Sequence, residues 1–443
     1  MKKYHISLLA ALFLGLTACD KRLDLEPFQS ISEEKALSTE QNVRAAVLGA
    51  YDALGQDGLL GGNSMLISEL MGADGEVQWV GTFDGLRTIF NHQLIAENGN
   101  ALDTWNDAYD AINRCNNILS ALGILKDETE RKEAEGEALF VRSFAYFELV
   151  RLYAKTYEAG GNNNQLGVPL VLTPTRSITE SSFVSRATVE QVYTQIIADL
   201  AKAKAQLPEE NGARAGKYAA AALLARVYLQ MGRYADAKTN ADEVIGSNLY
   251  KLVSDVKDGW NNDDNSTEDI FAIQMSSQDA TQGTTWIFYS IPAFGGRDGD
   301  IEIEKKHLDL YPAGDARATL FYEGNGATRT LKWRDQYKNI PIIRLAEMYL
   351  ISAEAAVRLN QNGDDAFNAV HKRAGLSEVR GVKLDEILLE RRLELAFEGH
   401  RLHDIKRLKG KADGLPYTDN KLTLPIPARE TDANPNLKQN DGY

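Results

Sequence analysis

The chain has 443 residues, of which 44% are hydrophobic and 25% are charged, and its formal net charge is −14. These proportions are ordinary for a folded globular protein. An acidic surface argues against nucleic acid as a partner and against a basic face that would lie on anionic lipid. We therefore expect no binding to nucleic acid, and any attachment to a membrane has to come from another feature of the chain.

The N-terminus has the pattern of a lipoprotein signal. Lys2 and Lys3 precede an apolar run at 6–16, and a Leu-Thr-Ala sequence leads directly to Cys19. Such a run is typical of a secretory signal and is too short to span a bilayer, which takes about 20 apolar residues. We predict removal of residues 1–18 and lipidation of Cys19, because several acyl chains on one residue hold a protein to a membrane well. The alternative is an ordinary signal with a coincidental cysteine.

Cys115 is the other cysteine of the chain. Lipidation of Cys19 would leave it without a disulfide partner. Cys115 shares one helical face with Trp105, Ile112 and Leu119, which predicts a buried position. We therefore interpret it as a structural thiol rather than a nucleophile.

Helical periodicity dominates the rest of the sequence. The predicted helices are 39–54, 101–122, 131–155, 188–206, 217–230, 233–246, 342–359, 364–373 and 384–398. Two pairs of predicted helices, at 218–245 and 343–371, have small residues where the two helices cross. In each pair a tight turn follows the first helix. This pattern resembles tetratricopeptide (TPR) repeats, although a generic bundle of α-hairpins is the alternative. We predict a mainly α fold, a TPR-like helix-pair scaffold with long irregular loops and short β-hairpins.

Two regions lack helical periodicity. Residues 58–100 are rich in glycine, and residues 247–341 combine Asn and Asp clusters with several tryptophans and the β-prone run 270–273. Their aromatic content argues against disorder. Long loops on a rigid scaffold commonly carry binding sites, so we expect the ligand site in these two regions.

Motifs for catalysis or metal binding are absent from the sequence. His400 and His403 are three residues apart, but their charged neighbours favour a network of ion pairs over a metal site. The acidic turn at 261–265 is better interpreted as a solvated turn than as a calcium loop. We expect no cofactor, no metal and no enzyme activity. A pair of carboxylates for glycoside hydrolysis stays an open alternative, because sequence alone cannot single out such a pair.

Five segments in the C-terminal third carry a family resemblance. They are RLAEMYLISAEA at 344–355, LERRLELAFEGHR at 389–401, DIKR at 404–407, LPIP at 424–427 and NPNLKQN at 434–440. Together they resemble the SusD/RagB family of nutrient-binding outer-membrane lipoproteins of Bacteroidetes, and the resemblance covers essentially the whole mature chain.

The charged residues of these segments are spaced as on one face of a helix. The charges between Arg391 and Arg407 lie three and four apart, so we expect them on one helix, where they pair and hold the fold.

The resemblance implies a function. It implies a non-catalytic receptor for oligosaccharides, and some members of the family bind peptides. They cap a SusC-like TonB-dependent transporter, so the expected partners are this transporter, an oligosaccharide or peptide ligand, and the membrane through the N-terminal lipid. The expected location is the outer membrane, facing the cell exterior. Residues 19–443 are expected to form one SusD-like domain. The alternatives are a helical glycoside hydrolase and a TPR-type scaffold lipoprotein that docks proteins.

The resemblance also places the ligand site in the two irregular regions. Sugars stack their C–H faces on aromatic rings and need polar side chains for their hydroxyls. The candidate ligand-binding residues are Trp79, Phe83, Asp74, Trp286 and Tyr289, and Phe294 and Arg297 are weaker candidates. We expect Trp79 and Trp286 to form one aromatic platform. The alternative for each aromatic is local packing of a long loop.

Overall fold

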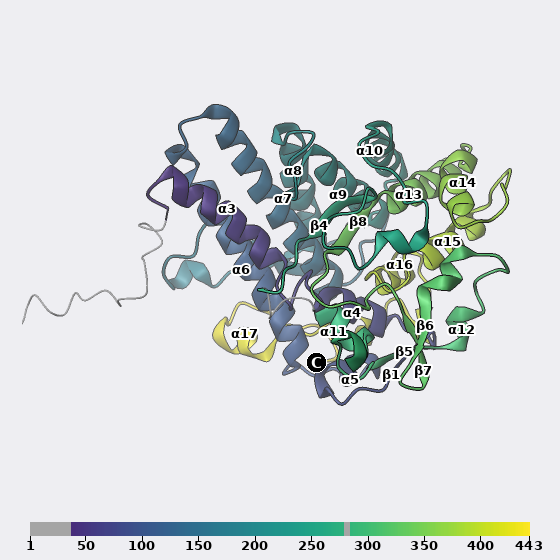
Figure 1. Cartoon of the computed structure of the whole chain (residues 1–443). Coiled ribbons are helices and arrows are strands. Elements are labelled where there is room, and N and C mark those ends of the chain that lie inside the picture. The colour runs from purple at the N-terminus through teal and green to yellow at the C-terminus, as the bar shows by residue number, and fades with distance from the viewer. Residues whose placement is uncertain (1–36, 279–283) are drawn as a thin grey trace, which may run out of the picture.

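A row of antiparallel helices forms the body of the protein. The computed structural model describes residues 37–278 and 284–443, so the predicted signal sequence and Cys19 lie outside the described residues. Helices make up 51% of the structure. Each helix of the row packs against the next, in the order α3, α6, α7, α8, α9, α10, α13, α14 (Figure 1). The predicted TPR-like, mainly α fold is confirmed.

The nine predicted helices are all present, with ends that differ by a few residues. They are α3 (Glu40–Leu54), α6 (Gly99–Ala121), α7 (Glu128–Tyr153), α8 (Val189–Gln206), α9 (Lys217–Gln230), α10 (Tyr234–Gly246), α13 (Leu345–Arg358), α14 (Asp364–Arg373) and α15 (Leu384–Glu394). Side chains cap several N-termini: Thr188 accepts a hydrogen bond from the backbone N–H of Gln191, and Gln191 reaches back to Thr188. Such a capping box fixes the start of a helix.

The pair α9 and α10 illustrates the TPR-like packing. Alanine side chains at 219–222 and at 225 are fully buried on α9, and Ala237 and Ala241 are fully buried on α10. Gly232 turns the chain between the helices with a φ of +72°. That backbone conformation favours glycine, and small side chains at the crossing let the two helices approach closely.

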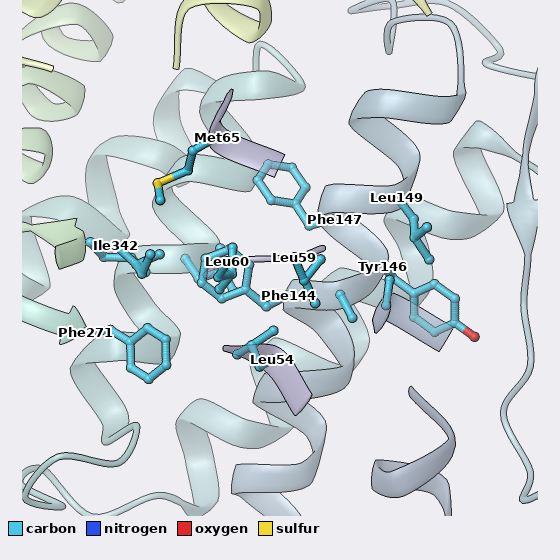
Figure 2. Packing of buried hydrophobic residues seen from close by; sticks show 14 of the residues in the cluster. Leu54, Leu59, Leu60, Met65, Phe144, Tyr146, Phe147, Leu149, Phe271 and Ile342 are labelled. Atoms are coloured by element: carbon cyan, nitrogen blue, oxygen red, sulfur yellow. The ribbon is translucent and has the colours of Figure 1, made fainter. Parts of the chain in front are cut away.

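The core is centred on α7. Nearly every residue of this helix from Gly136 to Tyr153 is buried, as expected for a helix surrounded by other elements. Phe140 packs edge-on against Phe271 with ring centroids 5.0 Å apart. Figure 2 shows Phe144 and Phe147 of α7 among Leu54, Leu59 and Met65 from the N-terminal segment. Residues far apart in sequence therefore share one hydrophobic cluster.

Short antiparallel strand pairs complete the fold. The pairs are β1 (Val77–Trp79) with β5 (Ile301–Ile303), β2 (Leu166–Pro169) with β3 (Arg186–Thr188), β4 (Asp269–Ile273) with β8 (Ile340–Arg344), β6 (Phe321–Gly324) with β7 (Ala327–Thr330), and β9 (Lys411–Ala412) with β10 (Leu415–Pro416). The β-prone run 270–273 is part of β4. In register, Trp79 lies opposite Ile301 and Val77 opposite Ile303.

The two irregular regions hold more helix than the sequence predicts. The additional helices are α4 (Asn63–Met71), α5 (Asp84–Phe90), α11 (Thr284–Tyr289) and α12 (Lys305–Leu308), and α16 (Arg401–Arg407) and α17 (Ala428–Ala433) follow later in the chain. All nine residues of α4 are buried. Because α4 is also only nine residues long, it has too little amphipathic period to be predicted.

The expectation of one helix from Arg391 to Arg407 is wrong. Helix α15 ends at Glu394, and Phe397 and Gly399 have φ values of +67° and +79°. A Cβ atom on Gly399 would lie 2.9 Å from the Cα atom of Met65, so glycine is needed for this close approach to α4. The ion pairs therefore join different elements rather than successive turns of one helix.

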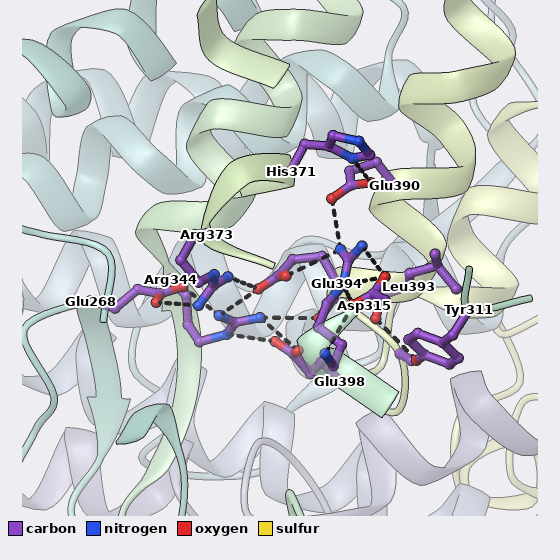
Figure 3. A network of polar contacts seen from close by, with 12 residues as sticks. Glu268, Tyr311, Asp315, Arg344, His371, Arg373, Glu390, Leu393, Glu394 and Glu398 are labelled. Carbon is purple, nitrogen blue, oxygen red and sulfur yellow. Dashed lines mark hydrogen bonds and ion pairs between the residues drawn. The ribbon is translucent and has the colours of Figure 1, made fainter. Parts of the chain in front are cut away.

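A buried network of charges ties the C-terminal elements together (Figure 3). Arg344 pairs with Glu268, with Glu394 and, at 2.8 Å, with Glu398. Arg373 also forms ion pairs with both Glu268 and Glu394. The network links the end of α14, the N-terminus of α13, the start of β4 and the C-terminus of α15, which supports a structural role for these charges.

Within the described residues, the structure contains no helix that is both long and apolar enough to cross a membrane.

Candidate functional site

Trp79 and Phe83 lie close to the same ring, that of Phe288 in α11. Trp79 ends β1 with only 4% of its surface exposed, and its ring centroid lies 5.5 Å from that of Phe288. Phe83 precedes α5 and packs edge-on against Phe288 at 5.4 Å. Phe83, however, is 50% exposed. The N-terminal loop and α11 therefore meet at one aromatic cluster, and of these three rings Phe83 is the exposed one.

Trp286 and Tyr289 lie in α11 with different neighbours. Trp286 is 8% exposed and packs against Tyr337 at a centroid distance of 6.1 Å. Tyr289 is buried against Phe397 at 6.0 Å. The indole Nε1 atoms of Trp79 and Trp286 are both buried without a hydrogen-bond partner among the described residues. The platform of Trp79 and Trp286, like the ligand role of each candidate residue, stays a prediction.

Asp74 is separated from these aromatics. It has a left-handed backbone conformation with a φ of +45°. Its carboxylate lies 3.1 Å from Nζ of Lys306 and 4.0 Å from Arg401, and it accepts a hydrogen bond from the backbone N–H of Asp413. Asp74 thus belongs to a polar network beside α16, and Figure 1 shows α16 and α5 in different parts of the molecule.

An arginine stacks on the exposed Phe83. The guanidinium carbon of Arg297 lies 4.5 Å from the centroid of the Phe83 ring. Nη2 of Arg297 donates to the hydroxyl of Thr82 at 2.6 Å, and its Nη1 lies 3.5 Å from Asp300. A guanidinium held over a ring in this way gains from cation–π attraction and keeps polar N–H groups at the ring edge.

A second pair repeats this arrangement. Phe294 is 37% exposed, and the guanidinium carbon of Arg334 lies 4.8 Å from its ring centroid. Arg334 forms a two-pronged ion pair with Asp335, and Tyr322 packs edge-on against Phe294.

The two pairs are neighbours. Phe294 and Arg297 belong to one short turn, and Ser290 accepts a hydrogen bond from the backbone N–H of Gly299 while its hydroxyl donates to the carbonyl of Arg334. We call Phe83, Arg297, Phe294 and Arg334 the aromatic–arginine surface.

Local sequence explains how this turn forms. Pro292 begins a short 3₁₀ turn that ends at Phe294, and Gly295 follows with a φ of +86°. A Cβ atom on Gly296 would lie 2.4 Å from the backbone of Ser290. Two successive glycines are therefore needed to bring Phe294 and Arg297 to the surface. Sequence reasoning missed Arg334, and only its place in an aromatic-rich loop could have indicated it.

The described residues contain no group of three or more His, Cys, Asp or Glu side chains that could hold a metal ion. Cys115 is fully buried in α6, and burial raises the pKa of its thiol to about 12. This agrees with the predicted structural thiol, because a reactive cysteine needs an accessible thiolate. The aromatic–arginine surface therefore offers stacking and hydrogen bonding as its chemistry.

A row of TPR-like helix pairs with long loops defines this protein as a TPR-like helical scaffold. Comparison with protein families gives two matches. Residues 23–229 match a family described as "Starch-binding associating with outer membrane", and residues 325–415 match the SusD family. The chain belongs to the SusD/RagB family.

Curated relatives and solved structures support this assignment. SusD-like protein P2 of Formosa agariphila is 26% identical, with all of both chains covered. The starch-binding protein SusD of Bacteroides thetaiotaomicron is 25% identical, over 72% of this chain and 74% of the relative. A solved putative sugar binding protein from Bacteroides vulgatus is 28% identical with a TM-score of 0.82, covering 92% of this chain and 99% of that one. Membership in this family supports carbohydrate binding, and the family description indicates association with the outer membrane.

Proposed function

We propose that this protein binds an oligosaccharide, or a related nutrient such as a peptide, at the cell surface without cleaving it. It then delivers the ligand to a SusC-like TonB-dependent transporter of the outer membrane. The observation that carries the binding role is the aromatic–arginine surface, where two exposed rings lie beside two guanidinium groups. The relatives described as starch-binding and sugar binding support the choice of a carbohydrate.

The chemistry of the surface suits a sugar. The C–H faces of a sugar ring contact exposed aromatic rings, and its hydroxyls accept hydrogen bonds from guanidinium N–H groups. Asp335 and Asp300 hold the two arginines in place and lower the mobility of their side chains. Such pre-organisation reduces the entropy lost on binding. In this proposal Phe83 contacts the ligand, and Trp79, Trp286 and Tyr289 support the loops that carry it.

The remaining parts of the proposal concern location and catalysis. Lipidation of Cys19 would tether one domain, residues 19–443, to the outer membrane with its loops facing the exterior. Binding without hydrolysis agrees with relatives that are described as binding proteins. The exposed rings of this surface also differ from the enclosed, water-excluding site in which hydrolytic catalysis is most effective.

Alanine substitution of the two exposed rings tests the site. We expect Phe83→Ala and Phe294→Ala each to weaken oligosaccharide binding about tenfold, because each removes a stacking contact worth roughly 1–1.5 kcal/mol. Leu172→Ala, which truncates another exposed apolar side chain, serves as the matched control. Binding is measured by calorimetric titration, with circular dichroism to check folding. Unchanged affinity in both folded variants would remove this surface from the ligand site.

A further inference from the structure

A cavity of about 320 Å³ lies between α15 and α16, apart from the aromatic–arginine surface. On α15, Asp385, Leu388, Leu389 and Arg392 line it with the i, i+3, i+4, i+7 spacing of one helical face. Residues at the start of β1 and in the turn between the two helices also line it. This volume is at the small end of the range for ligand pockets and suits one sugar ring or one amino-acid residue.

The cavity and the aromatic–arginine surface are different places on the molecule. Val77 lines the cavity, whereas Phe83 comes six residues later, beyond β1. None of the four residues of the aromatic–arginine surface lines the cavity.

The inner end of the cavity is built around Glu76. Its carboxylate lies 2.8 Å from Nδ1 of His307 and 2.9 Å from Arg401, and it also pairs with Arg392. Burial alone would raise the pKa of Glu76, but the hydrogen bond from His307 and the charges of Arg401 and Arg392 lower it to about 2. Glu76 is therefore ionised near neutral pH and fixes both arginines in position.

The lining offers unused donors and occupied acceptors. Nη1 of Arg391 and Nε of Arg401 are buried without a hydrogen-bond partner among the described residues. In contrast, Glu69 accepts from two backbone N–H groups, and Asp404 accepts from Arg391 and from Arg407. A buried donor without a partner costs free energy. A ligand for this cavity therefore has to supply hydrogen-bond acceptors.

The charges of the lining also bear on the ligand. Arg391, Arg392 and Arg401 contribute three positive charges, against the carboxylates of Glu76, Asp385 and Asp404. Burial raises the pKa of Glu69, the fourth acid of the lining, to about 7, so this group is partly neutral near that pH. Guanidinium groups with N–H donors that have no partner in the described part of the chain favour a ligand that carries its own carboxylate.

Apolar side chains line part of the cavity. They are those of Leu388, Leu389 and Leu408, together with Val77 and Phe397. Leu389 is 41% exposed, so its side chain is accessible to a ligand. A ligand for this cavity therefore needs an apolar face next to its charged group.

We propose that this cavity binds a small molecule with one carboxylate and a compact apolar face, and that Arg392 and Arg401 hold the carboxylate. An acidic sugar unit and the C-terminal residue of a peptide both have this chemistry. The site goes beyond the proposed oligosaccharide surface and does not depend on it.

Four probes separate these ligands: D-glucuronate against neutral D-glucose, and N-acetyl-leucine against neutral N-acetyl-leucinamide. Binding to the detergent-purified full chain is followed by saturation-transfer NMR. We expect at least one carboxylate to bind with a Kd below about 10 mM and its neutral match to bind at least about tenfold more weakly. Glucuronate alone would identify an acidic sugar, and N-acetyl-leucine alone a peptide C-terminus. No binding of either acid, or equal binding of acid and neutral match, would overturn the proposal.

Variants locate the binding. Arg392→Gln should weaken carboxylate binding about tenfold, whereas Asp385→Asn, which removes a negative charge at the mouth, should strengthen it about twofold to fivefold. Leu389→Trp should block the mouth, and Leu249→Trp, at a side chain of similar 40% exposure elsewhere, should have no effect. Phe83→Ala should also leave carboxylate binding unchanged, so failure of this site is distinguishable from failure of the oligosaccharide site. Unchanged binding in both Arg392→Gln and Leu389→Trp would place the carboxylate elsewhere and overturn the assignment.

Discussion

Arg344 stands at the N-terminus of α13 with three carboxylates around its guanidinium group. Its side chain is buried, and so are those of Glu268, Glu394 and Glu398. The neighbouring arginines lower the pKa of Glu394 despite its burial. A buried charge network of this kind fixes the geometry of the elements that contribute to it, and it is most sensitive to the loss of one member.

Removal of Arg344 tests that sensitivity. We expect Arg344→Met to lower the free energy of unfolding by roughly 3–5 kcal/mol, because it leaves buried carboxylates without their partner. Arg44→Met, which breaks exposed pairs with Glu40 and Glu130, is the matched control and should change little. Urea unfolding monitored by tryptophan fluorescence gives both values. Equal effects of the two substitutions would contradict a structural role for the buried network.

Glu69 predicts a dependence of stability on pH. Burial raises the pKa of its carboxyl to about 7, although backbone N–H groups of Arg401 and Gly399 oppose the shift. The folded state then keeps a proton that the unfolded state loses near pH 4.5, so this group makes the protein less stable as pH rises from about 4.5 to about 7. Glu69→Gln keeps the acceptor oxygen and removes the titration. We expect the variant to gain roughly 2 kcal/mol relative to the natural protein between pH 5 and pH 8.

The measurement for Glu69 is urea unfolding of both proteins at pH 5 and pH 8. The pKa of Glu76 is lowered to about 2 in the folded state, so its carboxylate stays ionised in both folded proteins between pH 5 and pH 8 and does not contribute to the difference. The same stability difference at both pH values would show that Glu69 does not change its protonation in this range.

At the scale of elements, α9 and α10 depend on small residues at their crossing. Ala241 is fully buried in α10, whereas Ala235 on the same helix is exposed. We expect Ala241→Leu to cost roughly 1–3 kcal/mol of unfolding free energy, because extra methyl groups overpack the crossing. Ala235→Leu should be close to neutral. Thermal unfolding of both variants is the test, and equal melting temperatures would argue against close TPR-like packing.

Sequence periodicity predicts long helices well and short buried or strained ones poorly. Most of the nine predicted helices have one apolar face, which is the signal that periodicity detects, and α7 and α9, which are buried over most of their length, are long apolar runs. Helix α4 is only nine residues long and has no exposed face, because all its residues are buried. The break after α15 depends on Phe397 with a positive φ, which is rare for an aromatic residue, so no local signal marked it.

The candidate site, like the fold, could be predicted from the sequence only in part. The sequence indicates which loops are rich in aromatics, and Phe83 and Phe294 are indeed exposed there. It cannot indicate which rings the fold buries, because Trp79 and Phe288 meet only through tertiary packing. Arg334 joins Phe294 across 40 residues of chain, and such a contact has no periodic signature.

At the scale of the whole molecule, the helix row supports the loops that carry the proposed oligosaccharide site, and the proposed carboxylate site lies between α15 and α16. The row runs across one side of the molecule, and α5, α11 and the strand pair β1–β5 lie together on another (Figure 1). This division allows one part of the surface to bind a ligand while helices remain available for a partner protein. The proposed receptor role therefore needs no change in the fold.

Calorimetric titration of the purified protein with a panel of oligosaccharides, with product analysis of the same samples, tests the central claim most directly. The account predicts saturable binding of at least one oligosaccharide, weakened by Phe83→Ala, with no cleavage products. Release of shorter sugars would contradict a non-catalytic receptor and favour a glycoside hydrolase. Absence of binding across the panel would contradict an oligosaccharide receptor and favour a peptide ligand or a protein-docking scaffold.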